Sequence, residues 1–293
     1  MTAFIKQILY GLVGILAGVA SWVIIEYLIA AQSGLGMYVL VSVVEGTVTG
    51  AIFGIFLGTV EGIAVSSKYR ILQGSVMGLV IGSVGGFFSF LLIQGIVFFV
   101  ISSEMFTLAD TSRKLMPVAR LVGICLLGGA LGSIEGFRSK SSRKLGIGIM
   151  GGLLGGLLGG IMFMFLLIQN PAITRLSGLV LIGAGIGIFY SILERKKAYG
   201  KVKVLNGGRK NKEFLLIKKV SSIGTAKDCD IVLNGYDGIG YHHGNIVWRE
   251  GELYLVPIDN SGVTIVNDMP TTEQPLKYED VIQVGSAKLF FLP

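Results

Sequence analysis

The feature that most constrains this chain is a series of long, uncharged apolar runs in its first 200 residues. Residues 71–103 and 145–174 contain no Asp, Glu, Lys or Arg. A bilayer core about 30 Å thick is crossed by roughly 20 apolar residues in a helix, so each run is long enough to span it. With 52% hydrophobic and only 15% charged residues, the chain is too apolar for one water-soluble domain. The first two thirds are therefore predicted to be a membrane domain.

Six membrane helices are predicted from these runs, at residues 8–31, 36–64, 71–102, 117–137, 145–169 and 174–193. The run at 117–137 is the weakest candidate, and it spans only if Arg120 and Glu135 lie at the two interfaces. Lys6 precedes the first run, and no small-residue cleavage site follows it. We therefore expect the first helix to be retained in the membrane and not removed as a signal peptide.

A glycine-rich pattern recurs in this half after 74 residues. The segment LGTVEG at 57–62 returns as LGSIEG at 131–136. The glycines that follow are Gly74, Gly78, Gly82, Gly85 and Gly86 in the first copy and Gly148, Gly152, Gly156, Gly159 and Gly160 in the second. The first helix also resembles the third, and the sixth resembles the fourth. The simplest account is an all-α membrane domain of three related hairpins, formed by helices 1–2, 3–4 and 5–6.

Glycine at every fourth position lies along one face of a helix. Without side chains on that face, neighbouring backbones approach closely and gain packing contacts in lipid. We interpret these faces as packing surfaces, with a pore lining or a moving interface as the alternative. They do not match a nucleotide-binding loop, because no Lys-Ser or Lys-Thr pair follows and no strand precedes them.

The loop charges predict the orientation of the helices. Basic residues gather in alternate connections, at Lys68 and Arg70, at Arg138, Lys140, Arg143 and Lys144, and at Arg195, Lys196 and Lys197. The turns at 32–36 and 170–171 are nearly uncharged, while the segment 104–120 carries both signs and weakens the contrast. By the positive-inside rule, both termini are expected in the cytoplasm of a multi-pass cell-membrane protein. The same rule explains the net charge of +7, so nucleic-acid binding is not predicted.

Carboxylates within membrane helices are candidates for function, because burying one at mid-bilayer costs about 3 kcal/mol. Glu61 and Glu135 fall at the cytoplasmic ends of their helices, and we expect them to pair with Lys or Arg at the interface. Glu26 and Glu45 flank the first outer turn, and Glu45 is the deeper of the two. For Glu45, a structural polar contact and an ion or proton site both remain open.

The last third of the chain alternates like a series of short strands. The expected strands are 202–205, 214–220, 231–233, 244–249, 253–258, 263–266, 281–284 and 288–292, separated by turn signals such as Asn234-Gly235 and Glu250-Gly251. This spacing is typical of an antiparallel sandwich. The predicted domains are therefore a six-helix membrane domain at 1–198 and a cytosolic all-β domain at 199–293.

The stretch at 222–247, SIGTAKDCDIVLNGYDGIGYHHGNIV, resembles the signature of the forkhead-associated (FHA) domain, a β-sandwich that reads phosphothreonine. Gly224, the CDIVL segment at 229–233 and the pair His243-Gly244 follow one another in the family's order. Downstream, SGVTIVN at 261–267 and the segment 276–285 match the family's later signatures. The resemblance implies a protein-interaction domain over the last third of the chain.

The resemblance also implies which residues would contact a partner. The family's three phosphate-contacting positions, an Arg, a Ser and an Asn, are occupied here by Thr225, Gly240 and Gly262. Strong phosphothreonine binding is therefore not expected, because the charge-assisted contact of the Arg is lost. His243 is kept, and in the family it mainly supports the loops. The residues of the same loops that could donate hydrogen bonds instead are Thr225, Lys227, Asn260 and Ser261.

No pattern in the sequence predicts an enzyme, a cofactor or a metal site. We find no nucleophile, base or carboxylate pair at catalytic spacing. His242 and His243 are adjacent on an expected strand and would point to opposite faces, with no Cys or acid cluster accompanying them. Cys125 lies in an apolar run and Cys229 in the last third, so no intradomain disulfide is expected.

Two functions fit these patterns. The first is a scaffold or signalling adaptor whose helices anchor it in the lipid bilayer and could form homo-oligomers, while its FHA-like domain docks a protein partner. The second is a small channel or transporter whose path lies in the glycine-rich bundle, with the FHA-like domain as its regulator. The first is favoured, because the last third resembles a known interaction fold and the membrane half lacks a clear transport site.

Overall fold

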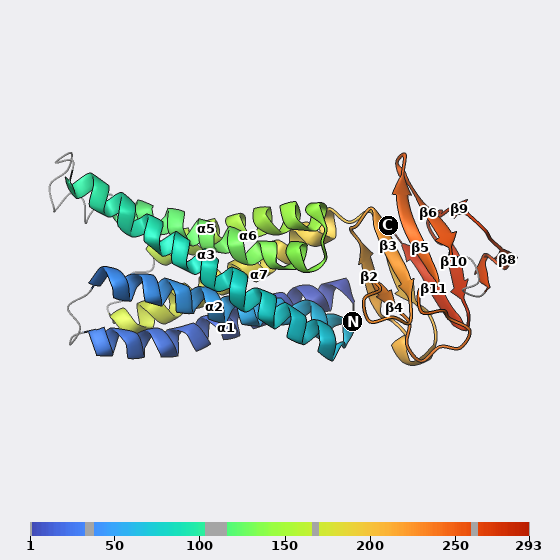
Figure 1. Cartoon of the computed structure of the whole chain (residues 1–293), viewed down its shortest axis with the longest axis horizontal. Helices are drawn as coiled ribbons and strands as arrows, with labels where there is room; N and C mark the ends of the chain where they lie inside the picture. Colours follow the sequence, from blue (N-terminus) through green and yellow to red (C-terminus); the bar gives the residue numbers. More distant parts are fainter. Residues whose placement is uncertain (1, 33–37, 103–115, 166–169, 259–262, 293) are drawn as a thin grey trace. The chain divides into compact units, whose positions relative to one another are not determined.

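The computed structural model describes residues 2–32, 38–102, 116–165, 170–258 and 263–292. It divides into two compact units, one formed by residues 7–193 and the other by residues 1–6 with 194–293. The first is a bundle of long helices and the second holds all the strands (Figure 1). The predicted boundary at 198/199 stays a prediction.

Six helices of the described chain are long and apolar enough to cross a membrane, as predicted. They are α1 (Ala3–Gln32), α2 (Tyr38–Val65), α3 (Lys68–Ser102), α5 (Met116–Arg138), α6 (Ser142–Met164) and α7 (Pro171–Lys196). The longest, α3, has 35 residues. At 1.5 Å per residue it is about 50 Å long, so it must tilt or project beyond a 30 Å hydrocarbon core.

Helix starts follow from local capping. Asn170 Oδ1 accepts a hydrogen bond from Ala172 N at 2.9 Å, and Pro171 occupies the first helical position of α7. Ser141 Oγ accepts one from Lys144 N at 3.3 Å and caps α6. These side chains supply acceptors for backbone N–H groups that the first helical turn leaves unpaired.

The turns after α2 and α5 have the same backbone geometry. Ser66 and Lys140, which are 74 positions apart, both have a positive φ, of 57° and 48°. Ser67 N donates to Gly62 O at 2.9 Å, and Ser141 N donates to Gly136 O at 3.1 Å. Each helix therefore ends in the same way. One residue adopts the left-handed backbone conformation, and the N–H of the next residue donates to the carbonyl five positions earlier. The sequence repeat thus corresponds to a repeated supersecondary structure.

Backbone touches backbone wherever the glycine faces of two helices meet. A Cβ added to Gly54 in α2 would collide with Gly78 O in α3, and a Cβ added to Gly132 in α5 would collide with Gly148 O in α6. A third contact of this kind joins α7 to α1, between Gly183 and Gly14. Only a residue without a side chain fits at such positions.

The glycine contacts lie both between and within the predicted hairpins. Those of α2–α3, α5–α6 and α7–α1 join helices from different predicted hairpins, whereas the contact of Gly155 with Gly185 joins α6 and α7 within one. The contact of Gly85 with Ala130 likewise joins α3 and α5. The repeat unit is therefore better described by the pairs α2–α3 and α5–α6, with α7–α1 as the third pair.

The described residues of the C-terminal sandwich form eleven strands in two sheets. One sheet has the order β2-β1-β11-β10-β7-β8, and the other has the order β4-β3-β5-β6-β9. The strands are β1 (Gly200–Val204), β2 (Glu213–Leu216), β3 (Val220–Gly224), β4 (Ile231–Val232), β5 (Gly244–Arg249), β6 (Glu252–Pro257), β7 (Thr264–Val266), β8 (Met269–Pro270), β9 (Gln274–Pro275), β10 (Val281–Val284) and β11 (Ala287–Leu292). All described pairings are antiparallel except that of β3 with β4.

Alternation along the strands places one apolar face in the core between the sheets. β1 and β11 alternate buried with more exposed residues, and Val202, Leu289 and Phe291 are almost fully buried. Ile223, Ile246 and Leu255 fill the core from the other sheet. Glu250 and Gly251, both at positive φ, form the two-residue turn between β5 and β6, the conformation that suits a tight hairpin.

One predicted strand is wrong. The run 214–220 is not continuous, because β2 ends at Leu216 and β3 begins at Val220. The two strands belong to different sheets, so the chain must cross from one layer to the other within the intervening residues. The short strands β8 and β9 were not predicted, since two-residue strands carry no alternation to detect.

Candidate functional site

The loops that the FHA resemblance singles out meet at one end of the sandwich. β3 pairs with β4 in parallel and with β5 in antiparallel register, which brings the loops on either side of β4 together. Thr225 N donates to Gly240 O at 3.1 Å, and the Thr225 hydroxyl donates to the same oxygen at 3.4 Å. Ala226 N donates to Tyr241 O at 3.0 Å. Two of the proposed partner-binding positions, Thr225 and Gly240, are therefore bonded to each other.

His243 is the structural centre of these loops. Its side chain is buried, and its Nδ1 accepts a hydrogen bond from Gly240 N at 3.2 Å. That bond assigns the proton to Nε2, which lies 3.1 Å from Thr264 Oγ1. The backbone of His243 also donates to Ile223 O and accepts from Ile258 N. The imidazole thus ties one loop to β7, and its burial leaves it no direct contact with a partner.

Three exposed apolar side chains, which we call the apolar edge, belong to residues next to the groups that His243 contacts. Tyr241, Ile258 and Val263 have exposed side chains, with exposed fractions of 70%, 39% and 64%. Tyr241 lies two positions before His243, and Ile258 N donates to His243 O. Val263 directly precedes Thr264, whose hydroxyl contacts the His243 imidazole. Lys227 is exposed on the loop that follows β3. Of the remaining predicted site residues, Asn260, Ser261 and Gly262 lie outside the described residues.

A cluster of three potential metal ligands lies on the same two loops, and sequence reasoning missed it. Cys229 Sγ is 3.3 Å from His242 Nδ1, and His242 Nε2 is 3.8 Å from Asp228 Oδ2. Burial raises the pKa of the Cys229 thiol, and the nearby charge of Asp228 raises it further. The expectation that no Cys or acid cluster accompanies His242 is therefore wrong, because Cys229 and Asp228 lie close to it in the folded chain. The parallel pairing of β3 with β4 brings the three together. That pairing could not be predicted, because β4 consists of two apolar residues only.

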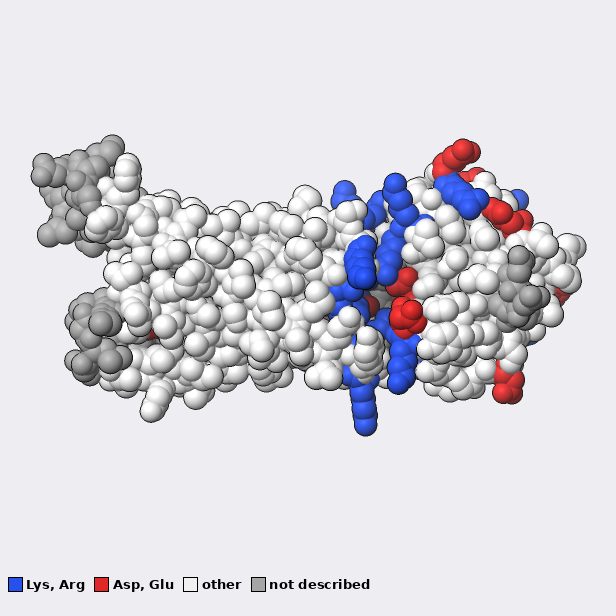
Figure 2. All heavy atoms as spheres, viewed as in Figure 1, with Lys and Arg blue, Asp and Glu red and all other residues white. Residues whose placement is uncertain are grey.

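The membrane half concentrates its cations at one end of the helices, where Figure 2 shows Lys and Arg gathered. At that end Glu135 is buried, and Arg138 Nε donates to its Oε2 at 2.7 Å. Arg138 also donates to Glu135 Oε1, and Lys144 Nζ lies 3.4 Å from the same oxygen. Glu61, the residue 74 positions earlier, contributes to the electrostatic environment of Arg138. One carboxylate thus forms ion pairs with two cations in a largely buried cluster.

Glu26 forms an ion pair that the sequence analysis did not foresee. Arg175 donates from Nε to Glu26 Oε1 at 2.6 Å and from a terminal nitrogen to Oε2 at 2.8 Å. This bidentate pair joins α1 to α7, and Trp22 Nε1 donates to Ala172 O nearby at 3.0 Å. Arg175 also interacts electrostatically with Glu45. Both interpretations of Glu45, a structural polar contact and an ion or proton site, stay predictions.

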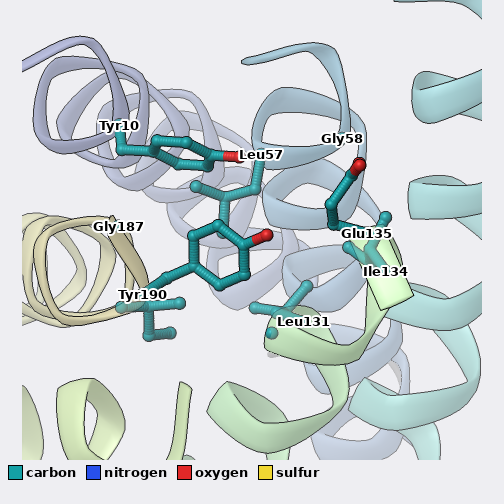
Figure 3. Close-up of a pocket in the computed structure, with 10 residues that line it drawn as sticks. Tyr10, Leu57, Gly58, Leu131, Ile134, Glu135, Gly187 and Tyr190 are labelled. Carbon is teal, nitrogen blue, oxygen red and sulfur yellow. The ribbon is translucent and has the colours of Figure 1, made fainter. Parts of the chain in front are cut away.

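A small cavity lies in the bundle beside Glu135, and Figure 3 shows the residues around it. Its lining includes Tyr10 and Tyr190, whose ring centroids are 4.9 Å apart. The volume is about 20 Å³, enough for roughly one water molecule. The cavity is too small for a hydrated ion or a metabolite.

Comparisons with known proteins agree with the fold of the last third. The family model described as the cytoplasmic domain of the inner membrane component of T3SS, the type III secretion system, matches residues 203–293. No curated protein matches the sequence.

Three solved structures are similar to this chain, over lengths that differ widely. One, from a study of phosphothreonine-dependent FHA interactions, is 22% identical and covers 32% of this chain and 95% of its own, with a TM-score of 0.30. An FHA domain from Chlamydia trachomatis is 19% identical over 32% of this chain and 96% of its own, also at 0.30. EmbR of Mycobacterium tuberculosis, in complex with a low affinity phosphopeptide, is 14% identical over 98% of this chain and 70% of its own, at 0.29. The C-terminal third is therefore an FHA-type domain, similar to the cytoplasmic domain of a type III secretion inner membrane component and joined here to six membrane-capable helices.

Proposed function

We propose that this protein is a membrane-anchored scaffold, and not an enzyme, whose FHA-type domain holds an unphosphorylated protein partner at the cytoplasmic face of the cell membrane. The observation that carries the proposal is the apolar edge of Tyr241, Ile258 and Val263 beside loops that lack the family's phosphate-binding charge. Exposed aromatic and aliphatic side chains contribute most where a partner excludes water from them. Thr225 and Gly240 support this edge through the hydrogen bonds that join their loops.

The decisive experiment is a pull-down from membranes. Intact protein is compared with a form lacking residues 201–293 and with a full-length variant carrying Tyr241→Ser and Val263→Ser. Both altered forms are expected to lose the partner. Met269→Ser is the matched control, because Met269 is as exposed, at 72%, but lies on β8 and is not one of the three side chains of the apolar edge. Retention of every partner by the double variant would contradict the proposal.

Phosphothreonine binding is expected to be absent or weak. A hydrogen bond to a charged group contributes about 1.5 to 3 kcal/mol, so loss of the Arg contact alone costs roughly tenfold to a hundredfold in affinity. The full-length protein in detergent is titrated with phosphothreonine peptides and with their unmodified counterparts. Micromolar binding that depends on the phosphate would restore the usual role of the FHA family.

Both termini are expected in the cytoplasm. The basic residues of the α2–α3 and α5–α6 turns and of the α7 end support this orientation. Cysteines introduced singly at Ser33, which lies outside the described residues, and at Asn170 are expected to react with an impermeant reagent added outside. Cysteines at Ser67 and Ser141 are expected to be protected, and the opposite pattern would place the FHA-type domain outside the cell.

The second candidate function is a small channel or transporter regulated by the FHA-type domain. The observation that bears on it is the water-sized cavity beside Glu135, where a carboxylate and two tyrosines meet between helices. Its size and the ion pairs of Glu135 favour a structural role. Flux through reconstituted vesicles that changed in a normally folded Glu135→Gln variant would favour transport instead.

A further inference from the structure

The side chains of Asp228, Cys229 and His242 lie on two loops that are separate in the sequence. Asp228 and Cys229 lie near the end of the loop between β3 and β4, and His242 lies near the end of the loop between β4 and β5. Backbone hydrogen bonds from Thr225 N to Gly240 O and from Ala226 N to Tyr241 O hold these loops together, and a bond from Cys229 N to Ala226 O closes a turn within the first loop. The fold therefore fixes the Cα positions of the cluster before any side chain interacts.

The spacing of the side chains suits a tetrahedral metal site. One ligand atom from each of Asp228, Cys229 and His242 lies within 4.8 Å of the others. Zinc binds sulfur at about 2.3 Å and nitrogen or oxygen at about 2.0–2.2 Å, which places neighbouring tetrahedral ligands roughly 3.5 Å apart. Cys229 Sγ and His242 Nδ1 are already 3.3 Å apart. Asp228 is exposed, so its carboxylate can turn toward them without disturbing the core.

We propose that Asp228, Cys229 and His242 bind a thiophilic divalent transition-metal ion such as zinc. Thiolate, imidazole and carboxylate together are ligands that zinc accepts, and three protein ligands leave a fourth position for water or another group. Binding replaces the thiol proton of Cys229 by the metal and releases that proton to solvent. The ion joins the two loops that Thr225 and Gly240 hold together in its absence. This site does not depend on the proposed scaffold function.

The same three side chains also form a series of thiol, imidazole and carboxylate, the arrangement that activates the cysteine in enzymes with a thiol nucleophile. Cys229, however, is fully buried among residues such as Ala226 and Val232, which leaves no room at the sulfur for a substrate larger than a single ion. A metal approaches from the half-exposed side of His242, whose side chain is 44% exposed. The geometry therefore favours metal binding over nucleophilic catalysis.

The test uses cobalt as a spectroscopic probe on the full-length protein in detergent, purified without a histidine tag. Cys125→Ser provides the background, because Cys125 is the other cysteine of the chain. Titration with Co²⁺ is expected to produce a thiolate-to-cobalt charge-transfer band that saturates near one equivalent and disappears when Zn²⁺ is added. In the same background, His242→Gln and Asp228→Asn are each expected to weaken binding at least about tenfold.

The controls separate a ligand set from a damaged fold. His242 and Asp228 have exposed side chains, so their variants keep the sandwich even if Cys229→Ser, in the core, does not fold. Asp237→Asn, exposed in the loop before His242, is expected to leave Co²⁺ binding unchanged. A Cys125→Ser protein without the charge-transfer band would overturn the proposal. Unchanged Co²⁺ affinity in both His242→Gln and Asp228→Asn would also overturn it. The contact between Cys229 Sγ and His242 Nδ1 would then be a thiol hydrogen bond only.

Discussion

Gly132→Ala is expected to destabilise the helical bundle by at least about 1–3 kcal/mol, the usual effect of overpacking a tight core. The added Cβ would overlap Gly148 O, and the Gly152 Cα lies only 3.3 Å away. Because these neighbours are backbone atoms, no rotamer change can relieve the clash. The helices α5 and α6 must separate, and the contacts along their whole glycine face weaken together. Unfolding in mixed detergent, followed by circular dichroism, measures the effect.

Gly146→Ala is the matched control, because a Cβ there meets nothing within 4 Å. Alanine has the higher helix propensity by about 1 kcal/mol, so this variant is expected to be neutral or stabilising. Gly58→Ala tests the repeat, since its Cβ would collide with Gly74 O in the equivalent place. Equal stability of Gly132→Ala and Gly146→Ala would show that the helices are not in backbone contact.

Glu135→Gln is expected to cost about 3–5 kcal/mol, the typical effect of breaking a buried ion pair by removing one partner. The amide keeps the size of the carboxylate but leaves Arg138 and Lys144 without its charge. The side chains of all three residues are at most 10% exposed, so water cannot replace the lost charge. The same unfolding measurement applies, and a similar loss is expected for Glu61→Gln on the basis of the repeat.

An exposed ion pair provides the comparison. Arg249 and Glu273 are 2.7 Å apart, but their side chains are 54% and 45% exposed. Pairs of this kind contribute about 0–1 kcal/mol, so Glu273→Gln is expected to have little effect on the FHA-type domain. A Glu135→Gln protein as stable as wild type would mean that the cations at this end of the bundle are solvated.

Sequence alone was sufficient for the features that depend on local pattern. Hydropathy predicted the six helices, because lipid requires long apolar segments of any spanning helix. Alternation predicted most of the sandwich, and the signature around Gly224 and His243 identified its FHA-type fold. The strand predicted at 214–220 failed because a change of sheet between Leu216 and Val220 leaves no mark on hydrophobicity.

Contacts between distant segments were harder to predict. Arg175 was not singled out, although it binds Glu26, because charge alone does not say which helices are neighbours. The glycine repeat was visible, but its partners in space, such as Gly132 with Gly148, depend on how the helices are arranged. The cluster of Asp228, Cys229 and His242 likewise requires a parallel strand pair, which a two-residue strand cannot signal.

The pairing of α7 with α1 has a consequence for the order in which the bundle is built. α1 enters the membrane before the other helices, yet its glycine face is filled only when Gly183 arrives opposite Gly14 and Arg175 reaches Glu26. At about 5–20 residues per second, synthesis of the intervening chain takes on the order of ten seconds or more. During that interval α1 exposes a backbone groove and the Glu26 carboxylate to its surroundings. Biogenesis of this protein is therefore expected to depend on a factor or lipid environment that shields its first helix until its last one is made.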